Sequence, residues 1–182
     1  MKQVKILGLF MLGFLFTVNS FAQSKMVGGA AMYPTKNIVE NAVNSKDHTT
    51  LVAAVKAAGL VPTLESKGPF TVFAPTNEAF NALPAGAVEN LLKPENKSKL
   101  SSVLTYHVVA GNYSSMDLMK LVKSKMGKAS LKTVAGGNLY FSKKGKNIIV
   151  TDENGRTAMI TIADVNQSNG VIHVINKVLL PK

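Results

Sequence analysis

The sequence predicts a mixed α+β fold in which helices dominate the first half of the chain and antiparallel strands dominate the second. Between residues 38 and 122, apolar residues recur mainly at the three- and four-residue spacing of amphipathic helices. After residue 127, short apolar segments alternate with turns that contain Gly or Asn, which is typical of β-hairpins. With 46% hydrophobic and 17% charged residues among 182, the chain has the composition of one globular domain.

The first 22 residues (1–22) are expected to be a cleaved signal peptide. Two Lys precede an uncharged apolar segment, residues 6–18, and the small residues Ser20 and Ala22 stand just before the predicted cleavage site. The alternative is a membrane anchor, but an apolar core of about 13 residues is shorter than the roughly 20 that a spanning helix needs. We therefore expect a secreted, periplasmic or cell-surface protein with no integral membrane span in its mature chain.

Residues 23–36 are small and contain Gly, so they are expected to form a flexible N-terminal arm ahead of a folded domain at residues 37–181. Helical spacing of apolar residues predicts a helix over residues 38–43 and a second helix that ends at Gly59. Gly is suited to the left-handed conformation that closes a helix. The polar surroundings of His48 predict an exposed side chain at the start of the second helix.

A strand-to-helix corner is predicted around Pro75. Residues 70–74 are expected to form a strand, Pro75 ends it, and Thr76 can cap the helix that starts at Asn77. Further helical segments are predicted over residues 85–92, 94–104 and 114–122.

Residues 105–109 are predicted as a strand, which would direct Tyr106 and His107 to opposite faces. The remaining chain is predicted to form strands over residues 129–134, 139–142, 147–151, 157–165 and 171–180. Asn-Gly pairs at residues 154–155 and 169–170 are strong hairpin signals, because both residue types accept a positive φ angle.

Three separated segments resemble signatures of the fasciclin (FAS1) domain family. They are residues 71–80 (TVFAPTNEAF), Tyr106-His107, and residues 169–175 (NGVIHVI) with VLLP shortly after. One departure is Asn176, where the family often has Asp. The resemblance implies a wedge-shaped β-sandwich with several helices, found in exported and cell-surface proteins, and it implies adhesion or extracellular binding rather than catalysis.

The same resemblance nominates Tyr106, His107, Asp164 and Val165 as adhesion candidates. In animal members the Tyr-His region and an Asp-Ile pair are implicated in integrin-dependent adhesion, and the second pair reads Asp164-Val165 here. The structural alternative for His107, as for His173, is a buried neutral imidazole hydrogen-bonded to the backbone. For Asp164 the alternative is a cap of the turn that follows it.

Composition and motifs argue against most enzyme classes. The absence of Cys excludes thiol nucleophiles and thiolate metal sites, and three His leave little room for a protein-built metal centre. The short motifs of hydrolases, P-loop proteins, zinc proteases and dinucleotide-binding folds are absent from the sequence. Asp152 and Glu153 are expected to be solvated turn residues. We therefore expect no catalytic residue, no metal and no cofactor.

The chain is strongly basic, with a formal net charge of +11 at pH 7. No acidic residue lies between Leu118 and Thr151, and three of the Lys in that stretch, Lys143, Lys144 and Lys146, share one predicted turn. These Lys are interpreted either as solvated residues that protect a sheet edge or as an attraction for an anionic polymer or membrane surface. Nucleic acid is a disfavoured partner, because export separates the chain from the genome and Arg is nearly absent.

We therefore expect an exported fasciclin-domain protein that binds an extracellular or envelope protein, or an anionic polysaccharide, without catalysis. Such binding would serve cell adhesion or attachment to an extracellular matrix. The alternative is a periplasmic small-ligand-binding or envelope-maintenance protein that uses a pocket between helices and sheet. The sequence indicates no particular oligomeric state.

Overall fold

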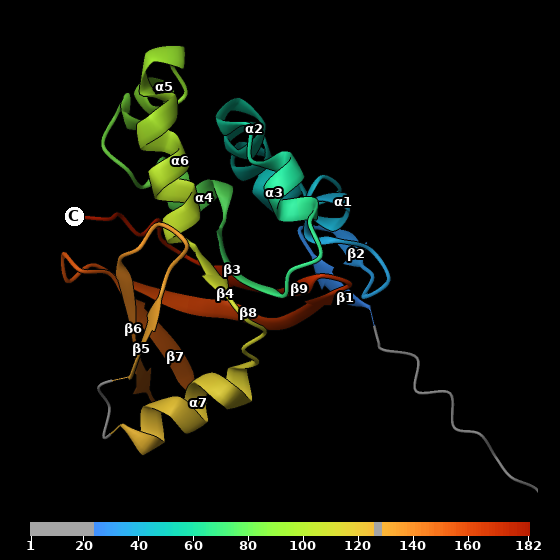
Figure 1. Ribbon diagram of the computed structural model, residues 1–182, viewed down its shortest axis with the longest axis vertical. Coiled ribbons are helices and arrows are strands. Elements are labelled where there is room, and N and C mark those ends of the chain that lie inside the picture. The colour runs from blue at the N-terminus through green and yellow to red at the C-terminus, as the bar shows by residue number, and fades with distance from the viewer. Residues whose placement is uncertain (1–23, 126–128) are drawn as a thin grey trace, which may run out of the picture.

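A seven-stranded mixed sheet organises the computed structural model, which describes residues 24–125 and 129–182 (Figure 1). The predicted signal peptide lies outside the described residues. The strand order is β4-β3-β9-β8-β7-β6-β5, and β3 and β9 run parallel while the other neighbours are antiparallel. The strands are β3 (Phe70–Pro75), β4 (Val108–Ala110), β5 (Ala129–Lys132), β6 (Asn138–Lys144), β7 (Asn147–Thr151), β8 (Thr157–Gln167) and β9 (Gly170–Ile175).

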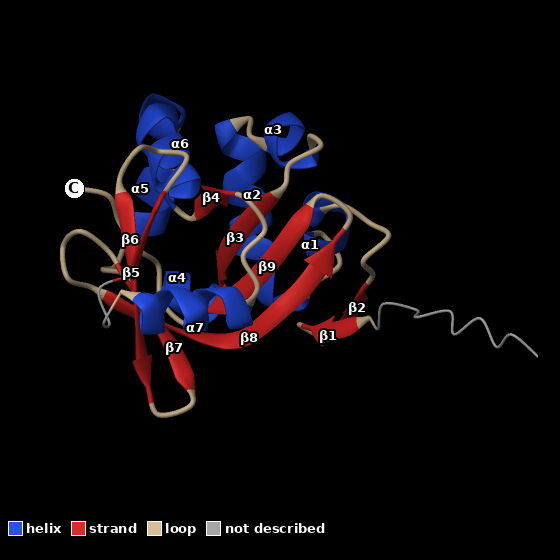
Figure 2. Ribbon diagram, turned by 60° about the horizontal axis from the view of Figure 1, so that its bottom comes forward, coloured by secondary structure: helices blue, strands red, loops and turns tan. Residues whose placement is uncertain are grey.

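The sheet bends back on itself along β8. Figure 2 shows β8 as a long curved strand, and its register against β9 shifts between Ile160 and Ile162 and again before Val165. Such irregularities bend a strand and increase its twist. The two edges of the sheet then meet, because Val109 of β4 bridges Thr133, which follows β5. The result is a wedge-like sandwich, so the predicted α+β class is confirmed.

Helices cover the two outer sides of this sandwich. Figure 1 shows α1 to α6 gathered on the side of β3, β4 and β9, and α7 across the other end. The helices are α1 (Ile38–Ala42), α2 (Thr49–Ala58), α3 (Val61–Glu65), α4 (Asn77–Asn81), α5 (Ala87–Leu91), α6 (Lys97–Tyr106) and α7 (Ser115–Ser124), with 3-10 helices at Lys46–His48 and Pro94–Asn96.

Local sequence explains where several helices begin and end. The Asn37 side chain accepts from the Glu40 N–H while the Glu40 carboxylate accepts from the Asn37 N–H, which forms a complete capping box for α1. Thr76 accepts from the Ala79 N–H and caps α4, as predicted. Gly59 ends α2 with a φ angle of 73°, also as predicted.

The apolar residues form two cores that share β3 and β9. The first core lies between α1 to α6 and one face of these strands, and the second lies between the two halves of the sheet and α7. In β3, Val72 and Ala74 enter the first core while Phe73 enters the second. In β9, Val174 enters the first core and Ile175 the second. Side chains that alternate between two buried faces require apolar residues at nearly every position, as in this strand pair.

The flexible arm expected at residues 23–36 is instead largely a hairpin of β1 (Lys25–Val27) and β2 (Ala30–Met32). Gly28 and Gly29 make its turn with φ angles of 57° and 76°. Val27 and Met32 are both 2% exposed in the first core. The expectation was wrong because two buried apolar side chains, separated by a Gly-Gly turn, are enough to anchor so short a segment.

The strand expected at residues 105–109 is also shorter than predicted. Helix α6 continues through Tyr106, His107 forms its C-cap, and only Val108–Ala110 is extended. At the C-terminal end, β9 stops at Ile175 and the chain leaves the sheet. The side chain of Asn176 there accepts a hydrogen bond from the Met159 N–H.

Candidate functional site

The Tyr106-His107 pair lies inside the protein. Tyr106 is 0% exposed and belongs to the second core, where its hydroxyl donates to the Asn138 carbonyl at 2.8 Å and accepts from the Glu153 N–H at 3.1 Å. Burial raises the pKa of Tyr106 to about 12, an effect that the nearby Glu153 and Asp152 carboxylates reinforce. The hydroxyl therefore fastens the end of α6 to the sheet.

His107 is 3% exposed and uses both ring nitrogens for the backbone. Its Nε2 atom accepts from the Leu179 N–H at 3.0 Å, so Nδ1 carries the proton and donates to the Val103 carbonyl at 2.8 Å. Burial lowers the pKa of His107 to about 4, which keeps the ring neutral. His107 therefore has the buried, backbone-bonded environment of the structural alternative, and both Tyr106 and His107 lie away from the surface.

Asp164 joins the sheet to helix α7. It lies in β8 with a φ angle of 57°, and its carboxylate accepts from both the Ser115 N–H, at 2.6 Å, and the Ser115 hydroxyl. A carboxylate at the first turn of a helix is stabilised by the unpaired N–H groups there. The expected cap of the following turn is therefore wrong, because the Asp164 carboxylate instead accepts from Ser115, the first residue of a helix far away in sequence. Its neighbour Val165 is 0% exposed in the first core.

Ser115, Asp164 and His173 bring together the residue types of a catalytic triad without its connections. The Ser115 hydroxyl bonds the carboxylate directly. His173 accepts from the Asp164 N–H on Nδ1 at 3.2 Å and donates from Nε2 to the Tyr113 carbonyl at 2.8 Å. Burial lowers the pKa of His173, and its ring stacks on Phe73. Since both nitrogens are occupied by backbone, this histidine cannot take a proton from Ser115, and it is structural as predicted.

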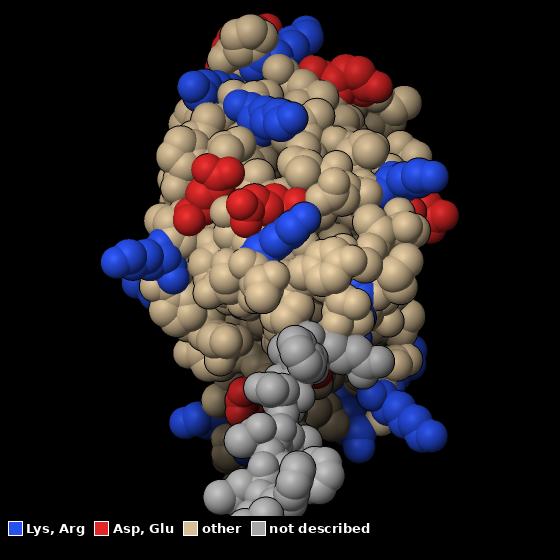
Figure 3. Space-filling view, turned by 90° about the vertical axis from the view of Figure 1, so that its right-hand side faces the viewer, with Lys and Arg blue, Asp and Glu red and all other residues tan. Residues whose placement is uncertain are grey.

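The three Lys at residues 143–146 lie together at an exposed turn. Lys143 and Lys144 end β6, Lys146 precedes β7, and all three side chains are exposed. This β6–β7 turn projects from the rest of the molecule at the bottom of Figure 2. We name Lys143, Lys144 and Lys146 the basic hairpin. Lys and acidic side chains also share the face drawn in Figure 3, so positive charge is not confined to this turn.

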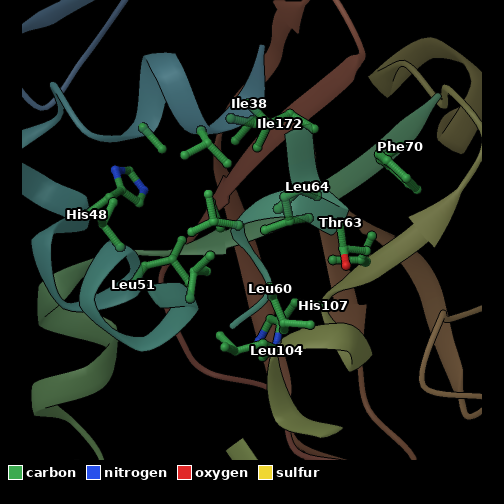
Figure 4. A pocket seen from close by; sticks show the side chains of 18 of the residues that line it. Ile38, His48, Leu51, Leu60, Thr63, Leu64, Phe70, Leu104, His107 and Ile172 are labelled. Carbon is green, nitrogen blue, oxygen red and sulfur yellow. The ribbon is translucent and has the colours of Figure 1, made fainter. Parts of the chain in front are cut away.

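An apolar pocket lies between the N-terminal helices and the strands β3, β4 and β9, away from the basic hairpin. It has a volume of about 70 Å³, and α1, α2, α3, α6 and strands β3, β4 and β9 supply its lining. Figure 4 shows His48 at one end of the pocket and Thr63 and Phe70 at the other. Lys56, Thr63 and Val134 are exposed lining residues. The sequence predicted no lining residues for such a pocket, because it depends on packing between helices and strands that are far apart in the sequence.

His48 departs most from the sequence prediction. It was expected to be exposed, but it is 1% exposed and lines the apolar pocket. Its Nδ1 atom lies 2.8 Å from the Ser45 hydroxyl, whereas its Nε2 atom has no hydrogen-bond partner among the described residues. Burial lowers the pKa of His48, although the Ala74 backbone and the Asp47 carboxylate partly oppose that shift. The ring is therefore neutral at pH 7.

Asp152 is a second polar residue whose burial the sequence did not predict. It is 2% exposed, and its carboxylate accepts from the N–H groups of Asn154, Arg156 and Leu180. Within residues 24–125 and 129–182, no group of three or more His, Asp or Glu is arranged to hold a metal ion. Over the same residues, no helix has both the length and the apolar character needed to span a bilayer.

Fold and sites together define a two-core α+β domain whose carboxylates and histidines mostly hold the backbone together. The fasciclin domain family matches residues 46–181, and the chain belongs to this family, which confirms the resemblance seen in three segments. The family is generally non-enzymatic.

Similar proteins come from bacteria and animals. Protein sll1483 of Synechocystis sp. is 48% identical over 159 residues, which cover 87% of this chain and 81% of that protein. Immunogenic protein MPB70 of Mycobacterium bovis is 34% identical over 145 residues, covering 77% of this chain and 66% of that protein. Transforming growth factor-beta-induced protein ig-h3 of Sus scrofa is 41% identical over 131 residues, which span 72% of this chain but 17% of that protein.

A solved structure shares the fold. The FAS1 domain pair of the insect cell adhesion molecule Fasciclin I superposes with a TM-score of 0.72 at 19% identity, covering 80% of this chain and 51% of that one. The predicted FAS1-type architecture is therefore confirmed.

Proposed function

We propose that this chain is an exported, non-catalytic binding protein whose basic hairpin attaches to an anionic polysaccharide of the cell envelope or extracellular matrix. The observation that carries the proposal is the clustering of Lys143, Lys144 and Lys146 on one projecting turn. None of these three Lys forms an ion pair with any residue that the structure describes. Unpaired cations on a projecting turn attract a polyanion without having to break internal contacts first.

The family supports the type of function more than the partner. The solved structure that shares the fold comes from Fasciclin I, an insect cell adhesion molecule, which supports adhesion as the role. The N-terminal sequence pattern supports export to the periplasm, the cell surface or the medium. An acidic protein surface would use the same three Lys, so the binding assay includes one.

Absence of catalysis belongs to the same proposal. Its support is the internal bonding of His107 and His173, each of which has both ring nitrogens bonded to backbone groups. A general base needs a nitrogen free to accept a proton from the reacting group. Neither ring offers one, although Ser115 and Asp164 lie close to His173. The unpartnered nitrogen of His48 lies in a pocket whose lining is mostly apolar.

The test replaces Lys143, Lys144 and Lys146 together with Gln and measures binding to immobilised alginate, a carboxylated polysaccharide, at low and moderate salt. An acidic protein, serum albumin, is assayed in parallel. Because the variant would lose three exposed ion pairs between Lys and the polymer, its affinity for alginate should fall roughly 3- to 100-fold at low salt. Wild-type binding should weaken as salt rises. The melting temperature should stay unchanged, because all three side chains are exposed.

A matched control changes the same amount of charge elsewhere. Lys93, Lys97 and Lys99 are exposed near the start of α6, and Figure 1 shows that helix at the far end from the β6–β7 turn. Gln at these three positions should leave alginate binding nearly unchanged. An equal loss in both triple variants would show that net charge, rather than the basic hairpin, drives binding, and the proposal would then be abandoned. If the triple variant lost only its binding to albumin, the partner would be an acidic protein rather than a polysaccharide.

A second candidate function is small-ligand binding, and the apolar pocket is the observation that favours it. Surface attachment leaves unexplained why a cavity of about 70 Å³ opens between α2, α3 and the sheet. The pocket and the basic hairpin lie on different cores, so one protein can carry both activities.

A further inference from the structure

The apolar pocket contains one polar atom that the fold leaves unused. Among the described residues, His48 Nε2 is the buried side-chain nitrogen or oxygen without a hydrogen-bond partner. The Ala74 backbone lies close enough to the ring to raise its pKa against the effect of burial, but it does not meet the geometry of a hydrogen bond to Nε2. A buried polar atom without a partner is costly, and a native structure usually supplies one. A ligand in the pocket can be that partner.

The chemistry of His48 selects the kind of polar group. Its Nδ1 atom and the Ser45 hydroxyl form one hydrogen bond, whose direction depends on the tautomer of the ring. Nε2 is therefore a donor in one tautomer and an acceptor in the other. A ligand hydroxyl can donate or accept and therefore suits either tautomer, whereas a ketone oxygen suits only one. A carboxylate is disfavoured, because the buried ring is neutral and the walls are mostly apolar, so a charge would remain unpaired.

The dimensions of the pocket select the apolar part. Its volume of about 70 Å³ is roughly half that of the apolar cavity of about 150 Å³ known to bind benzene in another protein. That space holds a short alkyl group and excludes a sterol or a folded lipid chain. Aliphatic residues such as Ile38, Leu51 and Leu64 surround it, so a saturated chain gains contact with the walls on entering.

We propose that the apolar pocket binds short, uncharged aliphatic alcohols of about two to four carbons, whose hydroxyl bonds His48 Nε2. The alkyl chain extends from His48 toward the exposed residues Lys56 and Thr63. This inference rests on the second candidate function and names its ligand class. It does not depend on the basic hairpin, so a failure of polysaccharide binding leaves it standing.

The first experiment follows the imidazole nitrogens of the full chain by ¹H–¹⁵N NMR during titration with 1-butanol. The protein has three His, and His107 and His173 serve as internal controls because their ring nitrogens are already bonded. We expect the His48 Nε2 resonance to shift saturably while those of the other two rings stay constant. An unchanged His48 resonance at saturating alcohol would overturn the proposal. Comparable shifts of all three rings would do the same, because they would indicate a general solvent effect.

Matched ligands and variants test the hydrogen bond separately from the cavity. Butyrate should bind at least about tenfold more weakly than 1-butanol, because its charge would remain unpaired, and n-butane should occupy the pocket without moving His48 Nε2. His48→Leu should weaken 1-butanol binding roughly 2- to 12-fold, which is the contribution of one hydrogen bond, and leave the affinity for n-butane similar. Val61→Phe fills the pocket from α3 and should remove binding of both ligands. If His48→Leu keeps full alcohol affinity, the polar anchor is refuted. If that variant does not fold, the wild-type NMR titration still decides.

Discussion

The internal histidines should make the protein acid-sensitive, and His107 gives the largest measurable effect. In the folded chain its pKa is about 4, whereas an unfolded chain protonates His near its ordinary value of 6.5. Between these values the unfolded state binds a proton that the folded state excludes. The contribution of His107 to stability is therefore complete above about pH 6.5 and is lost as the pH falls from 6.5 toward 4.

The size of this loss follows from the two pKa values. One pKa unit corresponds to about 1.4 kcal/mol, so the free energy of unfolding should fall by about 3 kcal/mol between pH 7 and pH 4 through His107 alone. His48 and His173 also have lowered pKa values, and they act in the same direction. A loss of this size is a large share of the 5–15 kcal/mol that roughly describes the stability of an ordinary domain.

The assay compares the wild type with His107→Gln by urea denaturation at several pH values from 7 to 4. Gln can donate and accept but does not titrate, and it is expected to lower stability at pH 7 by about 1–3 kcal/mol because it cannot match both ring contacts. The decisive quantity is the difference in pH dependence, in which the carboxylates and the other two His cancel. We expect the wild type to lose about 3 kcal/mol more than the variant over this range. Parallel curves for the two proteins would refute the assignment of a buried, neutral His107.

Three further substitutions test the carboxylates of Asp152 and Asp164. Asp152→Ala leaves the N–H groups of Asn154, Arg156 and Leu180 without their acceptor, and urea denaturation should show a loss of about 2–4 kcal/mol; a neutral result would mean that water replaces the carboxylate. Asp164→Ala removes the bonds to Ser115 and places Ala at a positive φ angle, so it should cost about 1–3 kcal/mol in the same assay. Asp164→Asn, which tolerates that backbone conformation, should cost clearly less, and an equal cost would contradict the backbone argument.

Local signals in the sequence were sufficient for most of the elements. The cap of α4 by Thr76 and the left-handed end of α2 at Gly59 are set by residues within one turn, and both occur as predicted. The boundary at Tyr106 could not be predicted this way, because the β-branched and apolar residues that follow Leu104 fit a helix or a strand equally well. Tertiary bonds decide the boundary, since Tyr106 is tied to Asn138 and His107 to Leu179.

Long-range contacts also explain why the site predictions are uneven. The basic hairpin could be located because an exposed turn is a local feature, with Lys-Gly-Lys between two predicted strands. His48 could not, because its neighbours Lys46 and Asp47 are charged and nothing nearby in sequence indicates burial. It is buried by segments far along the chain, including β3. Asp164 illustrates the same limit, since its partner Ser115 is 49 residues away.

The bonding of the signature segments determines where functional evidence can be found. Residues 71–80 and 169–175 supply both faces of β3 and β9, and almost all of these strand residues are buried. A substitution there removes core packing or a backbone hydrogen bond, so loss of binding in such a variant would reflect loss of folding. Informative positions are those whose side chains the fold does not use, namely the exposed Lys of the basic hairpin and the unpartnered nitrogen of His48. The pocket lies beside the first core and the basic hairpin beside the second, so polysaccharide binding and alcohol binding should be lost independently. A single substitution that removed both activities would indicate unfolding.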